Sequence, residues 1–251
     1  QHMETFGSEH ALVAAKSEIF AGTKAGGFAA YGDVGTEKAV PYIKNLVKVP
    51  VGEHGECGAL DVKCTSSGTS FKLALGIRQT ECSCKLLGRH NAYDVALAAA
   101  MAYKLGMSAE EIAEAVSRLE CVPHRLQPLS SGGVTVLDDA YNANVRGAEE
   151  ALFVLRLFGG RKIVVTPGIV ELGVLEESEN AALGEKLVGL DCVILVGDTL
   201  VGAVKNGYLR AGGDAEKLFV LPTLEAAKKK LSSLLQQGDA VLFLNDLPDV
   251  Y

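Results

Sequence analysis

A short apolar run that ends in two adjacent acids is the part of this sequence best suited to chemistry. The run covers residues 134–137, and the polar side chains that follow it belong to Asp138, Asp139, Tyr141, Asn142 and Asn144. In an open α/β sheet, ligands bind outside the carboxyl ends of the strands. We therefore predict that these carboxylate, hydroxyl and amide groups form a binding site at such an edge.

The net charge indicates that the ligand is a small molecule. The chain has 251 residues, 48% of them hydrophobic, and a formal net charge of −7. Nucleic-acid interfaces depend on clustered Lys and Arg, so this charge argues against nucleic-acid partners. The length is typical of one or two domains. No apolar run approaches the roughly 18 residues of a membrane span and no signal peptide is evident, so we expect a cytoplasmic protein.

The cysteines do not indicate a disulfide framework. Four of the six lie close together in sequence, at Cys57, Cys64, Cys82 and Cys84. The Cys82-x-Cys84 spacing is shorter than the usual zinc knuckle, and no histidine completes a ligand set nearby. We expect reduced, structural thiols.

Strands and helices alternate in the second half of the sequence. Apolar runs of strand length cover 134–137, 163–166, 192–196, 218–221 and 240–244. Helical patterns lie between them at 147–158, 176–188, 199–210 and 223–236. This alternation is typical of a mostly parallel sheet with helices on its faces.

The first half has a different pattern. Residues 8–20 are helix-like, with Leu12, Ala15 and Ile19 on one face. Residues 28–75 carry short alternating segments separated by Gly and Ser, which predicts an antiparallel meander.

Two further helices precede the alternating half. They are predicted at 89–105 and 108–119, and Ser108 with Glu111 forms a capping-box pattern at the second. The segment from Val122 to Leu126 follows these helices and precedes the first strand of the αβ repeat, so we place the domain boundary there.

Six short motifs occur in the order seen in the Mur ligases. They are QHMETFGS (1–8), AAKSEIF (14–20), GTSFKL (68–73), LGRHNAYD (87–94), PHRLQ (123–127) and DDAYNAN (138–144). The sequence therefore resembles this family of ATP-dependent, amide-forming ligases of peptidoglycan precursor synthesis over nearly its whole length. DDAYNAN and GRHN look most like the branch that joins D-alanyl-D-alanine to UDP-N-acetylmuramoyl-tripeptide.

The resemblance implies an α/β fold and an incomplete enzyme. Mur ligases have an N-terminal UDP-sugar domain and a central ATPase domain that opens with a phosphate loop, but no G-x-x-x-x-G-K-[ST] string occurs here. We expect residues 1–122 to be the latter part of the central domain, with helices and a small antiparallel sheet. Residues 123–251 would be the Rossmann-like C-terminal domain. The chain begins at Gln1, so we expect its partner to be a missing N-terminal region of the same protein, and the chain alone to be inactive.

The resemblance also implies a reaction. ATP phosphorylates the terminal carboxylate of the UDP-N-acetylmuramoyl-peptide, and the amine of D-alanyl-D-alanine attacks the acyl phosphate. Negative charge accumulates at the phosphoryl group, so Mg²⁺ and positioned cations supply most of the catalysis. By resemblance, His2 is a magnesium ligand and Lys16 is a lysine whose carbamate gives magnesium an oxygen ligand. Without the motifs, His2 would be a frayed terminal residue and Lys16 a solvated helix lysine.

Seven further residues match binding positions of the family. The nucleotide-binding residues are Asn91, Arg125, Asp139 and Tyr141, and the substrate-binding residues are Asn142, Asn144 and Glu171. By resemblance, Asn91 recognises adenine, for which an amide can donate and accept at once. Arg125 and Asp139 would contact the nucleotide and its ribose hydroxyls, although surface or interdomain ion pairs are the common alternative. For Asn144, a helix N-terminal position is an equally good interpretation.

Two departures from the family pattern leave the acceptor amine open: TPGIVELG (166–173) stands in place of a GDMxELG-like string, and NDLPDVY (245–251) stands in place of a KGSRG-like stretch. A third departure, Asp94 in place of an asparagine, concerns the motif around Asn91 and leaves one contact of that motif open. The related folylpolyglutamate and cyanophycin ligases are one alternative function. A non-catalytic binding module is another, because the phosphate loop is missing.

Overall fold

The computed structural model describes residues 6–32, 36 and 38–245, which form two compact units that divide between Glu120 and Cys121. The first unit holds a five-stranded sheet and the second a six-stranded sheet. Among the described helices, none combines the length and the apolar character needed to cross a membrane.

The sheet of the first unit is mixed. Its strands, in spatial order, are β1 (Phe28–Gly32), β2 (Val47–Val51), β3 (Cys57–Thr65), β4 (Gly68–Leu75) and β5 (Arg78–Cys84). β3, β4 and β5 pair antiparallel, as the meander predicts, but β1 and β2 are parallel and β5 lies beyond the predicted range. The prediction is therefore wrong for the first two strands. The segment between them contains the 3-10 helix η1 (Val40–Tyr42), and parallel pairing requires such a crossover in place of a hairpin turn.

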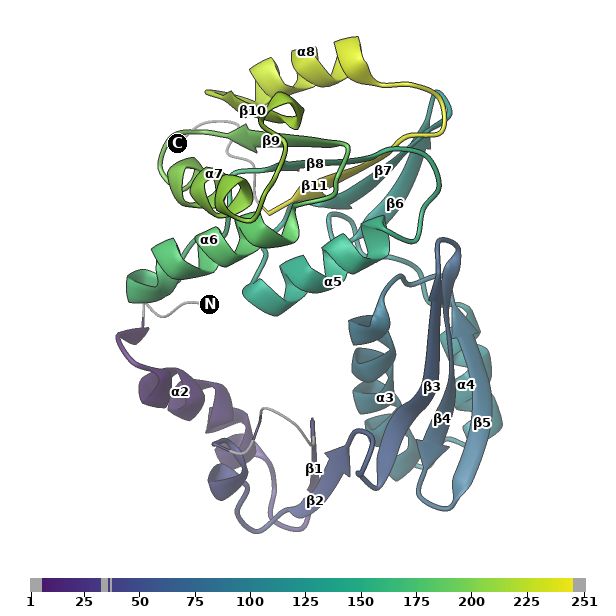
Figure 1. Ribbon diagram of the computed structural model, residues 1–251. Helices are drawn as coiled ribbons and strands as arrows, with labels where there is room; N and C mark the ends of the chain where they lie inside the picture. The colour runs from purple at the N-terminus through teal and green to yellow at the C-terminus, as the bar shows by residue number, and fades with distance from the viewer. Residues whose placement is uncertain (1–5, 33–35, 37, 246–251) are drawn as a thin grey trace. The chain divides into compact units, whose positions relative to one another are not determined.

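Two helices pack on the antiparallel part of this sheet (Figure 1). They are α3 (Arg89–Lys104) and α4 (Ala109–Ser117). The buried side chains of α3 recur at helical spacing: Ala92, Val95, Ala96, Ala99 and Ala100. The predicted capping box is confirmed, because the Ser108 side chain accepts from the Glu111 backbone N–H and the Glu111 carboxylate accepts from the Ser108 N–H. The core of this unit thus lies between α3, α4 and β2–β5.

Helix α2 (Glu9–Gly22) confirms the predicted helix near the start of the chain. Ser8 caps it by accepting a hydrogen bond from the backbone N–H of Ala11 at 3.2 Å. Within the described residues its apolar face is not part of a core, since Ile19 is 70% exposed and the buried residue of the helix is Ser17. The periodicity therefore predicts the helix but not the exposure of Ile19.

The second unit is a nearly parallel sheet, which confirms the Rossmann-like prediction. Its strands, in spatial order, are β10 (Leu218–Leu221), β9 (Cys192–Val196), β8 (Lys162–Thr166), β11 (Ala240–Leu244), β7 (Val134–Asp139) and β6 (Gln127–Ser131). All neighbours pair in parallel except β6 and β7. β6 is absent from the sequence prediction because its sequence, QPLSS, is mostly polar, as suits an edge strand. Gly132 and Gly133, with φ of 58° and 78°, form its tight turn to β7.

Helices cover both faces of this sheet. They are α5 (Val145–Leu155), α6 (Glu176–Lys186), α7 (Val201–Arg210) and α8 (Leu224–Leu234), with short 3-10 helices η2 (Gly173–Leu175) and η3 (Ala215–Lys217). Figure 1 shows α8 on one side of the sheet and α5, α6 and α7 on the other. Strands β8, β9 and β11 are therefore buried on both faces, which explains their nearly continuous apolar sequences.

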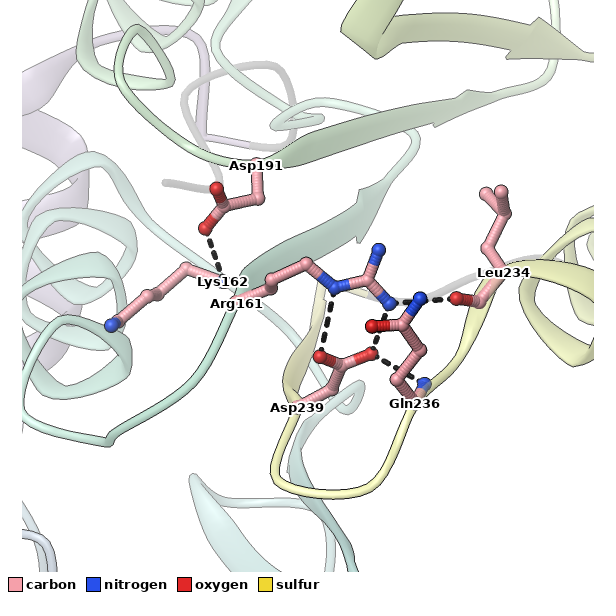
Figure 2. A network of polar contacts seen from close by, with 6 residues as sticks. All are labelled: Arg161, Lys162, Asp191, Leu234, Gln236 and Asp239. Atoms are coloured by element: carbon pink, nitrogen blue, oxygen red, sulfur yellow. Dashed lines mark hydrogen bonds and ion pairs between the residues drawn. The ribbon is translucent and has the colours of Figure 1, made fainter.

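A polar network fixes the amino ends of β8 and β11 (Figure 2). Asp239 is 3% exposed, and its carboxylate accepts hydrogen bonds from Arg161 Nε at 3.0 Å and Nη2 at 2.6 Å. The same carboxylate accepts from the backbone N–H of Gln236, while Arg161 Nη2 also donates to the carbonyl of Leu234. The pair thus joins the residues that precede two neighbouring strands to the end of α8.

The cysteines, all within the described ranges, form no disulfide. Cys57, Cys82, Cys84 and Cys192 are buried, and burial raises the pKa of Cys82 and of Cys192 to about 11. These thiols therefore stay protonated at neutral pH and pack as small apolar groups, which agrees with the structural role expected for them.

Candidate functional site

Three loops come together at the carboxyl edge of the second sheet. They follow β7, β8 and β11, and β11 lies between the other two strands. Leu244 at the end of β11 is in register with Asp139 at the end of β7. The loop after β7 (140–144, the β7 loop) and the loop after β8 (167–172, the β8 loop) are therefore held on either side of the end of β11.

Asp139 is the most strongly perturbed acid at this edge. One carboxylate oxygen accepts a hydrogen bond from the backbone N–H of Leu126 at 3.0 Å. Burial raises the pKa of Asp139 to about 6, while the hydrogen bond from Leu126 and the charge of Arg125 act in the opposite direction. A desolvated carboxyl group in this position is able to accept hydrogen bonds from a ligand, and such perturbed groups are frequent at functional sites.

The neighbouring acid, Asp138, faces a different partner. Its Oδ2 lies 2.8 Å from Nδ1 of His124, and its Oδ1 accepts from the backbone N–H of Ala140 at 3.2 Å. Successive side chains of a strand point to opposite faces, so the two acids cannot serve one ligand in the same way. His124 was not singled out from the sequence. In the structure its backbone is left-handed, with φ of 60°.

Arg125, Tyr141 and Asn142 form a second cluster in the same unit. The guanidinium carbon of Arg125 lies 4.2 Å from the centroid of the Tyr141 ring, and Nη1 donates to the backbone carbonyl of Asn142 at 3.3 Å. Within the described residues, the buried Oδ1 of Asn142 has no hydrogen-bond partner. Buried acceptors are normally satisfied, so this oxygen fits a ligand that donates a hydrogen bond.

Asn144 caps the helix that follows the loop. Its Oδ1 accepts from the backbone N–H of Gly147 at 2.8 Å, and its backbone is extended, as an N-cap residue requires. Of the two roles left open by the sequence, helix capping is therefore present in the structure. A contact with the incoming amine stays a prediction.

The β8 loop carries Glu171, which is half-buried and has a left-handed backbone with φ of 62°. Asn180, on α6, holds this loop by bonding to both the N–H and the carbonyl of Ile169 at 2.8 Å. Thr166 accepts from the N–H of Gly168 at 3.1 Å. The loop that departs from the family pattern is thus a well-connected segment whose backbone conformation is specified by buried side chains.

Asn245 links the β7 and β8 loops, a role that sequence reasoning missed although it noted the string NDLPDVY that begins at this residue. It is fully buried and bonds to Ala143 and Gly168 through its side chain and to Asp139 through its backbone. The signal available in the sequence was an asparagine directly after the apolar run 240–244, in the position that Asp138 and Asp139 occupy after their own run. Asn180 was missed because it stands in a helix interior.

Two of the remaining predicted site residues, Asn91 and Lys16, lie in the first unit. Asn91 is half-buried near the start of α3, where its Nδ2 donates to the carbonyl of Leu87 at 2.8 Å. Lys16 is exposed in α2. His2 lies outside the described residues, and among those described no three His, Cys, Asp or Glu side chains gather as metal ligands. The roles of these residues toward ATP and magnesium therefore stay predictions.

Comparison with known families matches both units of the chain. Residues 1–102 match the family model described as Mur ligase middle domain, and residues 124–245 match the one described as Mur ligase, glutamate ligase domain. The chain is 30% identical to the UDP-N-acetylmuramoyl-tripeptide--D-alanyl-D-alanine ligase of Escherichia coli, over 94% of this chain and 54% of that protein. It is 29% identical to the ligase of the same name from Bacillus subtilis, over 73% of this chain and 40% of that protein. The chain spans about half the length of these relatives.

Solved structures of Mur ligases are also similar to this chain. A crystal structure of MurF from Acinetobacter baumannii is similar with a TM-score of 0.85 and 27% identity, over 99% of this chain and 54% of that one. MurF ligase from Thermotoga maritima in complex with ADP has a TM-score of 0.83 at 21% identity, over 98% of this chain and 56% of that one, which shows the shared fold.

Proposed function

The chain belongs to the Mur ligase family, and we propose that it is the latter part of an enzyme that joins D-alanyl-D-alanine to UDP-N-acetylmuramoyl-tripeptide at the expense of ATP. One observation carries the proposal: 30% identity to a ligase of that name extends over 94% of the chain. The enzyme would work in the cytoplasm, where ATP and UDP-linked precursors are made.

The residues of the second unit are assigned to the nucleotide and the reacting groups. Asp139 would accept hydrogen bonds from ribose hydroxyls, for which a carboxylate is suited because it only accepts. Arg125, held against Tyr141 and the carbonyl of Asn142, would place its positive charge beside the phosphates. The buried Oδ1 of Asn142 would accept a hydrogen bond from the attacking amine, and Asn144 and Glu171 would line the approach of the acceptor.

The residues of the first unit are assigned to adenine and magnesium. Asn91 would bind adenine through the rest of its side-chain amide, because Nδ2 already donates a hydrogen bond to the Leu87 carbonyl. Lys16 is exposed in α2, so its amine is accessible to CO₂ for carbamate formation, and His2 would supply the second ligand. ATP with Mg²⁺ supplies the phosphoryl group that activates the peptide carboxylate as an acyl phosphate.

The chain alone is expected to bind nucleotide weakly and to catalyse little or no ligation. No phosphate-loop string occurs in its 251 residues, so in the proposed complete enzyme the cradle for the phosphates would come from a region outside this chain.

The test is phosphate release from ATP in the presence of UDP-N-acetylmuramoyl-tripeptide and D-alanyl-D-alanine. The assay compares the chain alone with the chain joined to its native upstream region. Release that depends on both substrates, in the joined protein only, supports the proposal. Release with glutamate in place of D-alanyl-D-alanine would instead favour a folylpolyglutamate-type ligase, whose fold is shared by the Mycobacterium tuberculosis folylpolyglutamate synthase at 18% identity and a TM-score of 0.68, over 94% of this chain and 56% of that one. If no phosphate is released with any acceptor, the result would favour the alternative of a non-catalytic binding module.

A further inference from the structure

Asn245 occupies the junction of the two loops that carry the predicted substrate-binding residues. Its relative exposure is 0%, and it directly follows strand β11. Its Oδ1 accepts from the backbone N–H of Ala143 at 2.8 Å, and its Nδ2 donates to the carbonyl of Gly168 at 2.7 Å. Its own N–H donates to the carbonyl of Asp139 at 3.0 Å. One side chain thus joins the β7 loop to the β8 loop.

Asparagine is suited to this position for two reasons. Its amide offers one acceptor and one donor on a single short side chain, which matches a backbone N–H on one side and a carbonyl on the other. Its backbone is left-handed, with φ of 70°, a conformation that asparagine tolerates better than most residues. Of the two side-chain hydrogen bonds, an aspartate could keep only the one to Ala143, and a glycine could keep neither while retaining the backbone conformation.

We propose that Asn245 is a positioning residue, which holds the β7 and β8 loops at one fixed separation so that the amine and the activated carboxyl group meet in a reactive geometry. This inference rests on the proposed function, because it takes the β7 loop, with Tyr141 and Asn142, to lie beside the nucleotide and the attacking amine, and the β8 loop, with Glu171, to line the approach of the acceptor. Small errors in such positioning cost large factors in rate.

Asn180 provides a matched control. It is also fully buried, and its side chain also accepts from one backbone N–H and donates to backbone carbonyls. Its side-chain hydrogen bonds reach Ile169 and Glu176, so they tie the β8 loop to α6. A general loss of stability should follow from changes at either asparagine, whereas the side-chain bridge between the two loops is made by Asn245.

The kinetic test uses the complete protein with Asn245→Asp, Asn245→Gly and Asn180→Asp. Asn245→Asp retains the bond to Ala143 and loses the donor to Gly168, so KM for the acceptor amine should rise roughly tenfold while KM for ATP changes little. Asn245→Gly releases both loops, so both KM values should rise. Asn180→Asp should leave KM for ATP unchanged. A purely structural role would lower the amount of active enzyme, and hence kcat, with both KM values unchanged in all three variants, and this result would overturn the proposal.

A second measurement does not depend on activity. Hydrogen exchange of the Ala143 amide should accelerate in Asn245→Gly and stay slow in Asn245→Asp and Asn180→Asp, because only the first variant removes its acceptor. Unchanged protection of this amide in Asn245→Gly would refute the clamp. If the unmodified complete protein shows no ATP consumption that depends on an acceptor, the proposed function fails, and the exchange data still decide whether Asn245 couples the loops.

Discussion

Replacing Asp239 with asparagine should destabilise the second unit by about 1.5–3 kcal/mol at neutral pH. The carboxylate of Asp239 accepts two hydrogen bonds from Arg161 and one from the backbone N–H of Gln236 (Figure 2). An asparagine has one acceptor oxygen, so its amide NH₂ must face one of these donors. The substitution therefore removes a buried charge and also sets two donors against each other.

The magnitude follows from the exposure of the two partners. Breaking a fully buried ion pair typically costs about 3–5 kcal/mol, because the remaining charge is left without a partner. Here the remaining charge is that of Arg161, whose side chain is 38% exposed and can be hydrated. The loss should therefore lie nearer that of charged hydrogen bonds, at roughly 1.5–3 kcal/mol.

The pH dependence of stability tests whether the ion pair of Asp239 with Arg161 is the cause. The hydrogen bonds from Arg161 hold the pKa of Asp239 below its ordinary value. A group whose pKa is lowered by folding contributes stability that is present above its unfolded pKa of about 3.9 and is lost as the pH falls through the folded pKa. The difference in the free energy of unfolding between the unmodified protein and Asp239→Asn should therefore have its full value at neutral pH and become smaller below about pH 4.

Hydrogen exchange of the β8 and β11 amides in urea is the suitable assay, because a chain of two units need not unfold in one step. Asp191→Asn is the matched control, since Asp191 is exposed and accepts only from the backbone N–H of Lys162 at 2.8 Å. It should cost no more than about 0.5 kcal/mol. Equal losses in the two variants, or a loss for Asp239→Asn that persists in acid, would refute the reasoning.

Three further predictions concern the site itself. Asp139→Asn should weaken nucleotide binding, measured by calorimetry, yet stabilise the second unit at pH 8. Burial raises the pKa of Asp139 to about 6, so ionisation of its carboxyl group disfavours folding as the pH rises from about 4 to above 6. The gain in stability from the substitution should therefore vanish at acid pH. A stability gain that is the same at pH 8 and at acid pH would contradict this cause. Asn144→Ala should cost about 1 kcal/mol in unfolding experiments through loss of the α5 cap, whereas Asn144→Asp should retain it; equal losses would show that the cap is not responsible. In the complete protein, Lys16→Ala should abolish ligation and short carboxylic acids should restore it, while unchanged activity would end the carbamate role.

Periodicity in the sequence was sufficient for most of the second unit. The strands β7, β8, β9, β10 and β11 lie within a residue or two of the predicted apolar runs, because strands buried on both faces are written as continuous apolar segments. Edge strand β6 carries no such signal, since one side of an edge strand is solvated. The parallel pairing of β1 and β2 was also not predictable, because short alternating segments do not specify which neighbour they pair with.

Some residues of the candidate site were predictable from the sequence and others were not. The order of local motifs identified Arg125, Asp139, Tyr141 and Asn142, and the structure places these four in one unit at one sheet edge. The roles assigned to His2, Lys16 and Asn91 rest on the motifs alone. Asn180 carries no motif and Asn245 appears only as the first residue of the departing string NDLPDVY, and their partners lie elsewhere in the chain, as far as 102 residues away for Ala143 and Asn245.

The sequence by itself determined the family, the alternation of strands and helices, and the chemical groups that follow each strand. These properties are local, since they depend on residue type and spacing along the chain. Only the tertiary structure decided that β11 lies between β7 and β8, and hence that the residue after β11 holds both loops. It also decided which acid is desolvated and which pairs with His124, because burial and hydrogen-bond partners are set by neighbours that the folded chain brings together.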